Sequence, residues 1–160
     1  FSIFKKRQKS DWKLVIVGRL AWKYDHFIES LKTYKYRGDV VMTGYVDETM
    51  LADLVSAAYG MVYPSLWEGF GMPVLEAMKA GVPVITGAGT SMQEIANDAA
   101  LYADVADQQD LADKMMLLYK EESLRSRLIQ KGFGRANDFS WDRTTTLLWN
   151  SLLKAANKQS

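Results

Sequence analysis

Short apolar runs rich in β-branched residues alternate with helical patterns over the first two thirds of this chain. This alternation is typical of βαβ units, in which helices connect parallel strands and cover the sheet. We predict strands at 13–17, 40–43, 60–63, 83–86 and 100–103, and helices at 25–36, 48–58, 73–80 and 92–97. Asp47 and Ser91 are placed to cap two of these helices. Because the first two connections are long enough for right-handed crossovers, the predicted fold class is a doubly wound α/β domain with a parallel sheet.

The pattern changes to helices alone from about residue 107. Asp107 begins one helix, a second spans about 121–137, and Ser140 caps a third. The third helix carries an apolar stripe formed by Trp141, Leu148, Trp149 and Leu152. Such a stripe must be buried against something. The simplest expectation is that it packs on the sheet of this domain.

Composition narrows the class of protein. A chain of 160 residues is expected to form a single domain, here residues 1–160. The net charge of +1 argues against a nucleic-acid partner. No apolar run approaches the roughly 20 residues of a membrane span, and the absence of cysteine permits a reducing cytoplasm. The one basic run, Lys5-Lys6-Arg7 with Lys9, is either the solvated face of a helix or a peripheral contact with an anionic membrane surface.

The most informative segment is Glu68-Gly69-Phe70-Gly71-Met72-Pro73-Val74-Leu75-Glu76. It follows the strand predicted at 60–63 and leads into a helix, for which Pro73 suits the first position. Gly69 and Gly71 have no Cβ, so backbone amides at the positive end of this helix can approach an anion closely. The segment therefore predicts an anion site with a carboxylate on either side.

The two glutamates indicate a ligand that offers hydroxyl groups as well as phosphate, since carboxylates would repel a phosphate alone. A carboxylate accepts hydrogen bonds from sugar hydroxyls efficiently. Glu76 is expected in the first helical turn, where the macrodipole favours its charge. Phosphate with sugar hydroxyls on both flanks describes a nucleotide-sugar. Taken singly, Glu68 is better explained as the end of a solvated loop and Glu76 as a residue that only complements the dipole. Taken together, with both glycines and Pro73 in register, the two glutamates favour the site.

Basic residues follow the first predicted strand. In open α/β sheets ligands bind at the carboxyl ends of strands. Arg19 comes just after that strand, where its guanidinium can hold a diphosphate through two hydrogen bonds. Lys23 lies four residues further along. The alternative for each is a solvated basic side chain.

As a set, these motifs resemble the E-x7-E signature of retaining glycosyltransferases with the two-domain GT-B fold, the glycosyl transferases group 1. The similarity spans about residues 12–157 and also includes Val17-Gly18-Arg19, Thr43-Gly44-Tyr45-Val46, Tyr63-Pro64-Ser65 and Ala80-Gly81-Val82-Pro83-Val84-Ile85. The chain resembles the C-terminal, donor-binding domain of such an enzyme. Family members commonly have a slightly longer gap between the arginine and the lysine than separates Arg19 from Lys23.

The resemblance implies a role for each motif position. Glu68 would contact the transferred sugar near the reacting carbon, and Glu76 would hydrogen-bond the ribose hydroxyls. Arg19 and Lys23 would neutralise the leaving diphosphate, so the predicted catalytic residues are these two and Glu68. The predicted donor-binding residues are Glu76, Gly69, Phe70, Gly71, Met72, Val74, Leu75 and Gly18, with Tyr45 and Val46 beside the nucleobase.

The implied reaction is transfer of a sugar from a nucleoside diphosphate to an acceptor hydroxyl, with retention at the anomeric carbon. Cationic side chains and helix amides would stabilise the charge on the leaving diphosphate. No Asp-x-Asp occurs in the chain, so no metal and no cofactor is expected. The implied setting is bacterial polysaccharide assembly in the cytoplasm, at the inner face of the membrane where the acceptor is lipid-linked.

The implied partners are a nucleotide-sugar, a glycan or lipid-linked acceptor, and the N-terminal domain of the same enzyme. That domain would precede Phe1 and bind the acceptor, and the terminal helix can reach across to it. The chain by itself is therefore expected to bind nucleotide weakly and to transfer little or nothing.

Two other functions fit parts of the sequence. A dinucleotide-binding oxidoreductase shares the fold class, but it requires Gly-x-Gly-x-x-Gly after the first strand, where only Gly18 is present. A non-catalytic module could keep the fold to bind nucleotide-sugars or to assemble with a partner chain. The presence of both Glu68 and Glu76 argues against this second alternative.

Overall fold

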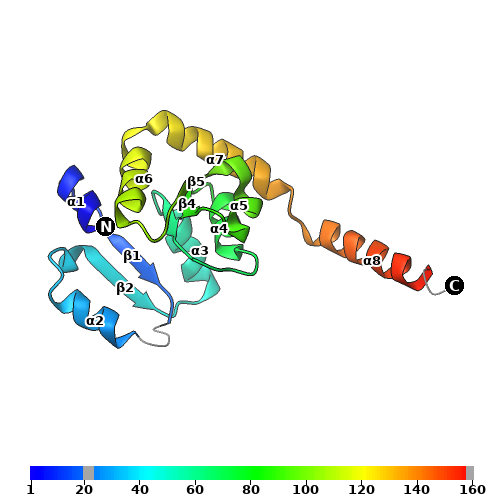
Figure 1. Cartoon of the computed structure of the whole chain (residues 1–160), viewed down its shortest axis with the longest axis horizontal. Coiled ribbons are helices and arrows are strands. Elements are labelled where there is room, and N and C mark those ends of the chain that lie inside the picture. Colours follow the sequence, from blue (N-terminus) through cyan, green and yellow to red (C-terminus); the bar gives the residue numbers. More distant parts are fainter. Residues whose placement is uncertain (20–23, 158–160) are drawn as a thin grey trace.

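The computed structural model of the protein describes residues 1–19 and 24–157, and Figure 1 shows how their elements are arranged. The strands in these ranges are β1 (Leu14–Val17), β2 (Val40–Gly44), β3 (Met61–Tyr63), β4 (Val84–Gly87) and β5 (Ala100–Ala103). The helices are α1 (Ser2–Gln8), α2 (Asp25–Lys32), α3 (Glu48–Ser56), α4 (Met72–Lys79), α5 (Ser91–Ala96), α6 (Gln108–Lys120), α7 (Glu122–Asn137) and α8 (Trp141–Asn157). Short 3-10 turns occupy Arg37–Asp39 and Asn97–Ala99. The predicted alternation of strands and helices is confirmed.

All strand pairs are parallel, as predicted, but the described strands form two sheets. β1 pairs with β2, while the second sheet has the order β3-β4-β5. Trp12 and Tyr59, which stand just before β1 and β3, pack edge to face with ring centroids 4.3 Å apart. This contact brings the beginnings of the two sheets together without a shared ladder of hydrogen bonds.

The hydrophobic core lies around β4, all of whose residues are buried. In β1, by contrast, half-buried residues alternate with exposed ones. A strand buried on both faces is expected where helices cover a parallel sheet on each side. The buried residues of α4, α5 and α7 in this core are Val74, Leu75, Ala77, Met78, Met92, Ile95, Ala96 and Ala136. The helix that carries the predicted site is therefore firmly anchored.

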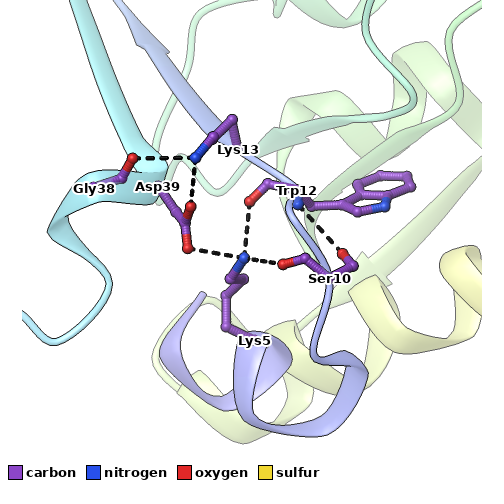
Figure 2. A network of polar contacts seen from close by, with 6 residues as sticks. All are labelled: Lys5, Ser10, Trp12, Lys13, Gly38 and Asp39. Carbon is purple, nitrogen blue, oxygen red and sulfur yellow. Dashed lines mark hydrogen bonds and ion pairs between the residues drawn. The ribbon is translucent and has the colours of Figure 1, made fainter.

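Helix α1 is held to the body by a buried lysine. The side chain of Lys5 is only 4% exposed, and its ammonium pairs with the Asp39 carboxylate at 2.9 Å. It also donates to the carbonyl oxygens of Ser10 and Trp12. Figure 2 shows that these contacts join α1 to the segment before β1 and to the turn before β2. Every donor of the ammonium group thus has an acceptor.

A second lysine completes this network. Lys13 pairs with the same Asp39 carboxylate at 2.6 Å (Figure 2). The hydrogen bond from Lys13, followed by the one from Lys5, lowers the pKa of Asp39 below its ordinary value. The carboxylate therefore stays ionised to lower pH in the folded chain than in the unfolded one.

Most predicted helix boundaries lie within two residues of the observed ones, but one helix end and one predicted cap are wrong. The helix predicted to reach residue 36 ends at Lys32, where Thr33 leaves the helical conformation and the Tyr34 amide donates three residues back to Leu31. Ser91 was predicted to cap α5, and that prediction is wrong, since Thr90 is the residue before the first helical one. The caps predicted at Asp47 and Ser140 each accept a backbone N–H and are confirmed. Asp107, predicted to begin a helix, is the residue directly before α6 and caps it in the same way.

Helix α8 extends away from the body of the molecule (Figure 1). None of its residues is buried, and its exposed apolar side chains are Trp141, Leu147, Leu148, Trp149, Leu152 and Leu153. The expectation that this stripe packs on the domain's own sheet is therefore wrong. None of the described helices is long and apolar enough to cross a membrane.

Candidate donor site at the start of α4

The segment after β3 turns sharply at Gly71 before it enters α4. Gly71 has φ 105° and ψ 42°, a conformation that side-chain-bearing residues rarely adopt. A Cβ at this position would also lie 2.9 Å from Cγ of Met92. Pro73 lies in the second helical position, one residue later than predicted, because the helix begins at Met72. The requirement for glycine here is therefore both conformational and steric.

Glu68 is held in place at two points. Its Oε1 atom accepts a hydrogen bond from the Tyr63 hydroxyl at 2.7 Å. Its backbone carbonyl accepts one from the Ser91 hydroxyl at 2.8 Å. Glu68 is half-buried, so its carboxylate is neither a free surface group nor part of the core. The reading of Glu68 as the end of a solvated loop does not fit this geometry.

The strand ends beneath the loop are tied together by Thr86. This residue is fully buried in β4, and its hydroxyl donates to the Tyr63 carbonyl at 2.9 Å. The same hydroxyl lies 3.1 Å from the sulfur of Met92, the side chain that abuts Gly71. β3, β4, the loop and α5 are therefore connected through contiguous contacts around Glu68.

Glu76 is exposed, but it lies beyond the first turn of α4, which contains no acidic residue. The predicted stabilisation of its charge by the first turn is therefore wrong, because the macrodipole acts mainly within that turn. The cause is the early start of the helix at Met72. The role of Glu76 as a hydroxyl acceptor stays a prediction.

The amides at the start of α4 differ in availability. Those of Val74 and Leu75 both donate to the Gly71 carbonyl, at 3.0 and 3.4 Å. Met72 is the first helical residue, so its amide precedes the first intrahelical hydrogen bond. The Phe70 ring packs edge to face on Phe139 at a centroid distance of 5.9 Å. An anion here would thus depend chiefly on the amides of the turn and of Met72.

A second group of predicted residues meets at the ends of β1 and β2. The Gly18 amide donates to the Gly44 carbonyl at 3.0 Å. The guanidinium carbon of Arg19 lies 4.6 Å from the ring centroid of Tyr45, a favourable cation–π contact. Val46, next to Tyr45, is half-buried. The carboxyl ends of these strands therefore bring a cation and an aromatic ring together.

Lys23 lies outside the described residues, so its prediction has no structural outcome. His26, the single histidine of the chain, is exposed on α2. Between β3 and Glu68 the loop also exposes two large apolar side chains, Leu66 at 73% and Trp67 at 90%. Apolar groups this exposed beside a polar site are typical of a surface that contacts something else.

Three residues around Glu68 were not among the predicted site residues: Tyr63, Thr86 and Ser91. Two of them had a visible signal in the sequence. Tyr63 is a polar-tipped aromatic at the end of an apolar strand, and Ser91 begins a helix. Neither signal says which side chain the hydroxyl would reach, because that depends on how the loop folds back.

Two open hollows lie elsewhere on the surface. One, of about 480 Å³, is lined by Ser10, Asp11, Trp12 and Tyr59. The other, of about 400 Å³, is lined by Lys5, Lys6, Lys9, Ser10, Lys35, Tyr36 and Asp39. Neither contains a residue of the loop that carries Glu68, so they are separate from the candidate donor site.

The structure places a fixed carboxylate and a glycine turn at the carboxyl end of a parallel strand, directly before a helix. In open α/β domains ligands bind at this edge of the sheet, and anions bind at helix N-termini. The sequence profile described as "Glycosyl transferases group 1" matches residues 1–135. The chain belongs to this family, and the predicted resemblance to the glycosyl transferases group 1 is confirmed.

Known proteins agree with this assignment. The chain is similar to O-antigen chain mannosyltransferase B of Escherichia coli, with 32% identity over 151 residues, which are 94% of this chain and 40% of that protein. Sucrose-phosphate synthase from Thermosynechococcus elongatus superimposes with a TM-score of 0.76 at 28% identity, over 89% of this chain and 39% of that one. The chain therefore spans about two fifths of the length of these proteins.

A third comparison concerns the fold alone. The crystal structure of Anabaena Alr3699/HepE in complex with UDP and glucose superimposes with a TM-score of 0.77 at 16% identity, over 88% of this chain and 40% of that one. The predicted α/β fold is confirmed by these structural neighbours, which are GT-B glycosyltransferases.

Proposed function

We propose that this chain is the donor-binding part of a glycosyltransferase that moves a sugar from a nucleoside diphosphate to an acceptor hydroxyl, with retention. The observation that carries the proposal is the Glu68 carboxylate, fixed by Tyr63 beside the glycine turn into α4 in a chain of this family. A carboxylate held there is placed to accept a hydrogen bond from a sugar whose phosphates lie at the helix N-terminus.

The remaining residues would each bind a different part of the donor. Glu76 would bind the ribose hydroxyls, and Tyr45 with Val46 would lie beside the nucleobase. Arg19, with Lys23, would bind the diphosphate as it leaves. Support for this division comes from the contact of Arg19 with Tyr45, which holds the guanidinium at the strand end. A protein of similar fold has been solved in complex with UDP and glucose.

The chemistry would be electrostatic. Negative charge develops on the leaving diphosphate as the sugar becomes oxocarbenium-like, and guanidinium, ammonium and helix amides stabilise that charge. We propose that these groups take the place of a metal ion, so that transfer proceeds without one. The support is the chain's lack of an Asp-x-Asp pair, together with the basic residues that follow β1.

The acceptor would be bound by another domain of the same protein. The chain covers about 40% of the relative from Escherichia coli, which leaves room for such a domain. Leu66, Trp67 and the apolar stripe of α8 are surfaces that it would cover. A polysaccharide acceptor is suggested by the O-antigen mannosyltransferase. Assembly of that polysaccharide in the cytoplasm is a further part of the proposal. The chain by itself would bind donor weakly and transfer little.

A peripheral contact with an anionic membrane surface belongs to this proposal. Lys6, Lys9 and Lys35 line the 400 Å³ hollow, in which the charge of Asp39 is already neutralised by two lysines. Flotation with vesicles should then recover more protein on anionic than on neutral lipid, and substitution of Lys6 and Lys9 by glutamine should remove the difference. Equal recovery on both lipids would exclude the contact.

Thermal melting with a panel of nucleotides tests the donor proposal. The panel contains UDP, GDP, ADP and their nucleotide-sugars, and at least one of these compounds should raise the melting temperature. The reason is that a ligand bound only by the folded state stabilises that state by RT ln(1 + [L]/Kd). Addition of EDTA should leave that shift unchanged. Glu76→Gln should reduce the shift, whereas Glu48→Gln on the exposed surface of α3 should not. No response to any nucleoside diphosphate would overturn the proposal.

A further inference from the structure

A tyrosine at the end of β3 contacts the Glu68 carboxylate. The hydroxyl of Tyr63 donates to its Oε1 atom at 2.7 Å. We propose that Tyr63 is a positioning residue of the donor site, which turns the Glu68 carboxylate so that its second oxygen faces the sugar of the bound nucleotide-sugar. The inference rests on the proposed function and adds the residue that orients the sugar-binding group.

Tyr63 can hold this position only while its hydroxyl keeps the proton. Burial, and then the hydrogen bond to the Glu68 carboxylate, raise the pKa of Tyr63 to about 12. At neutral pH the hydroxyl is therefore a donor, and its contact with an ionised carboxylate is of the stronger, charge-assisted kind. Tyr63 acts on the ligand through Glu68 alone.

The backbone on either side of this contact is fixed. The Tyr63 carbonyl accepts from the buried Thr86 hydroxyl at 2.9 Å. The Glu68 carbonyl accepts from the Ser91 hydroxyl at 2.8 Å. What remains free is rotation of the Glu68 side chain, which has several rotatable bonds. The Tyr63 hydroxyl removes this freedom, as a preorganised site requires.

This geometry separates recognition of the sugar from recognition of the nucleotide. Because the Oε1 atom of Glu68 already accepts from Tyr63, its Oε2 atom is the one that can accept a hydrogen bond from a hydroxyl of the sugar. The nucleoside diphosphate itself would be held by other residues, among them Arg19 and Glu76. Loss of the Tyr63 hydroxyl should therefore weaken binding of the nucleotide-sugar and leave binding of the bare nucleotide unchanged.

Titration calorimetry tests this separation. The ratio of the Kd of the nucleoside diphosphate to the Kd of its sugar measures recognition of the sugar, and the pair to use is the one that stabilises the protein most. Tyr63→Phe and Glu68→Gln should each lower this ratio by about tenfold, as expected for a hydrogen bond to a charged group. The ratio measured for the double variant should be no lower than the ratio for Glu68→Gln, because both changes act through one contact.

A matched control exists on β5. The pKa of Tyr102 is also raised to about 12, chiefly by burial, and its hydroxyl donates to the Asn97 carbonyl. Tyr102→Phe should keep the wild-type ratio. Ser91→Ala offers a second way to release Glu68, through its backbone, and should lower the ratio in the same direction as Tyr63→Phe.

Two results would overturn the inference. In the first, Tyr63→Phe keeps the wild-type ratio while Glu68→Gln loses it. In the second, Tyr63→Phe weakens the nucleotide and its sugar equally, which would show a role in folding alone. Both differ from a wild-type protein that binds no nucleoside diphosphate, a result that would overturn the proposed function and this inference with it.

Discussion

Gly71 lies directly against Met92, so that a Cβ on the glycine would stand 2.9 Å from Cγ of the methionine. The contact fixes where the chain turns from the loop into α4, and α4 is packed in the main core. The Thr86 hydroxyl oxygen lies 3.1 Å from the sulfur of the same buried methionine. The geometry of the turn is therefore determined by packing against Met92 as well as by the backbone conformation of Gly71.

Gly71→Ala should destabilise the protein by about 1–3 kcal/mol, because it combines an unfavourable positive φ with a steric overlap. Urea unfolding measures this change. Gly69→Ala is the matched control, since a Cβ there meets no atom within 4 Å, and it should alter the free energy of unfolding by less than about 0.5 kcal/mol. Equal effects of the two substitutions would contradict the role given to Met92.

Lys5→Met should cost about 1–3 kcal/mol, because it leaves two backbone carbonyls without their partner and removes one of the two cations on Asp39. Lys6→Met is the control, because the Lys6 side chain, next to Lys5 on α1, is exposed. The free energies of unfolding of both variants can be compared in urea at pH 7. A loss no larger for Lys5→Met than for Lys6→Met would show that the buried network contributes nothing.

The Asp39 carboxylate should make stability depend on acid pH. Its folded pKa is lowered from an ordinary value of 3.8, so its contribution is present above that value and is lost as the pH falls through the folded pKa. Asp39→Asn should therefore be less stable than the wild type at pH 7, and the difference should narrow in strongly acid solution. Unfolding curves recorded at neutral and acid pH would show this; a constant difference would contradict it.

The apolar stripe of α8 should contribute little within this chain. Trp149 is 60% exposed and Leu148 likewise 60%, so the double substitution to glutamine should change the free energy of unfolding of the body by less than about 0.5 kcal/mol. In a longer protein that contains the proposed acceptor domain, the same change should be clearly destabilising. Substantial destabilisation of the chain by itself would mean that α8 packs on its own domain.

The alternation of strands and helices was predictable because each element carries its own periodicity. All the strands were placed within a residue at either end, and the caps at Asp47 and Asp107 were recognised from their residue type. The end of α2 was not, since a turn stabilised by local hydrogen bonds near Tyr34 replaces its last predicted residues. A local sequence pattern does not show whether tertiary packing will favour a longer helix or a turn at such a position.

The candidate site was predictable in part, for a related reason. Glu68 and the glycines follow one another along the chain, so a motif reveals them. Tyr63 and Ser91 reach Glu68 only after the loop folds back across β3 and α5, and no spacing in the sequence encodes that approach. The outward direction of α8 was missed because an apolar stripe shows that a partner is needed without showing which surface provides it.

The most direct test of the central claim is a crystal structure of the protein with the nucleotide-sugar that stabilises it most. We predict that its phosphates lie at the turn around Gly71 and Met72, with a sugar hydroxyl within hydrogen-bonding distance of Glu68 Oε2 and with Tyr63 still bound to Oε1. A nucleotide-sugar found at another edge of the sheets, or in the lysine-lined hollow with Glu68 out of reach, would contradict the assignment.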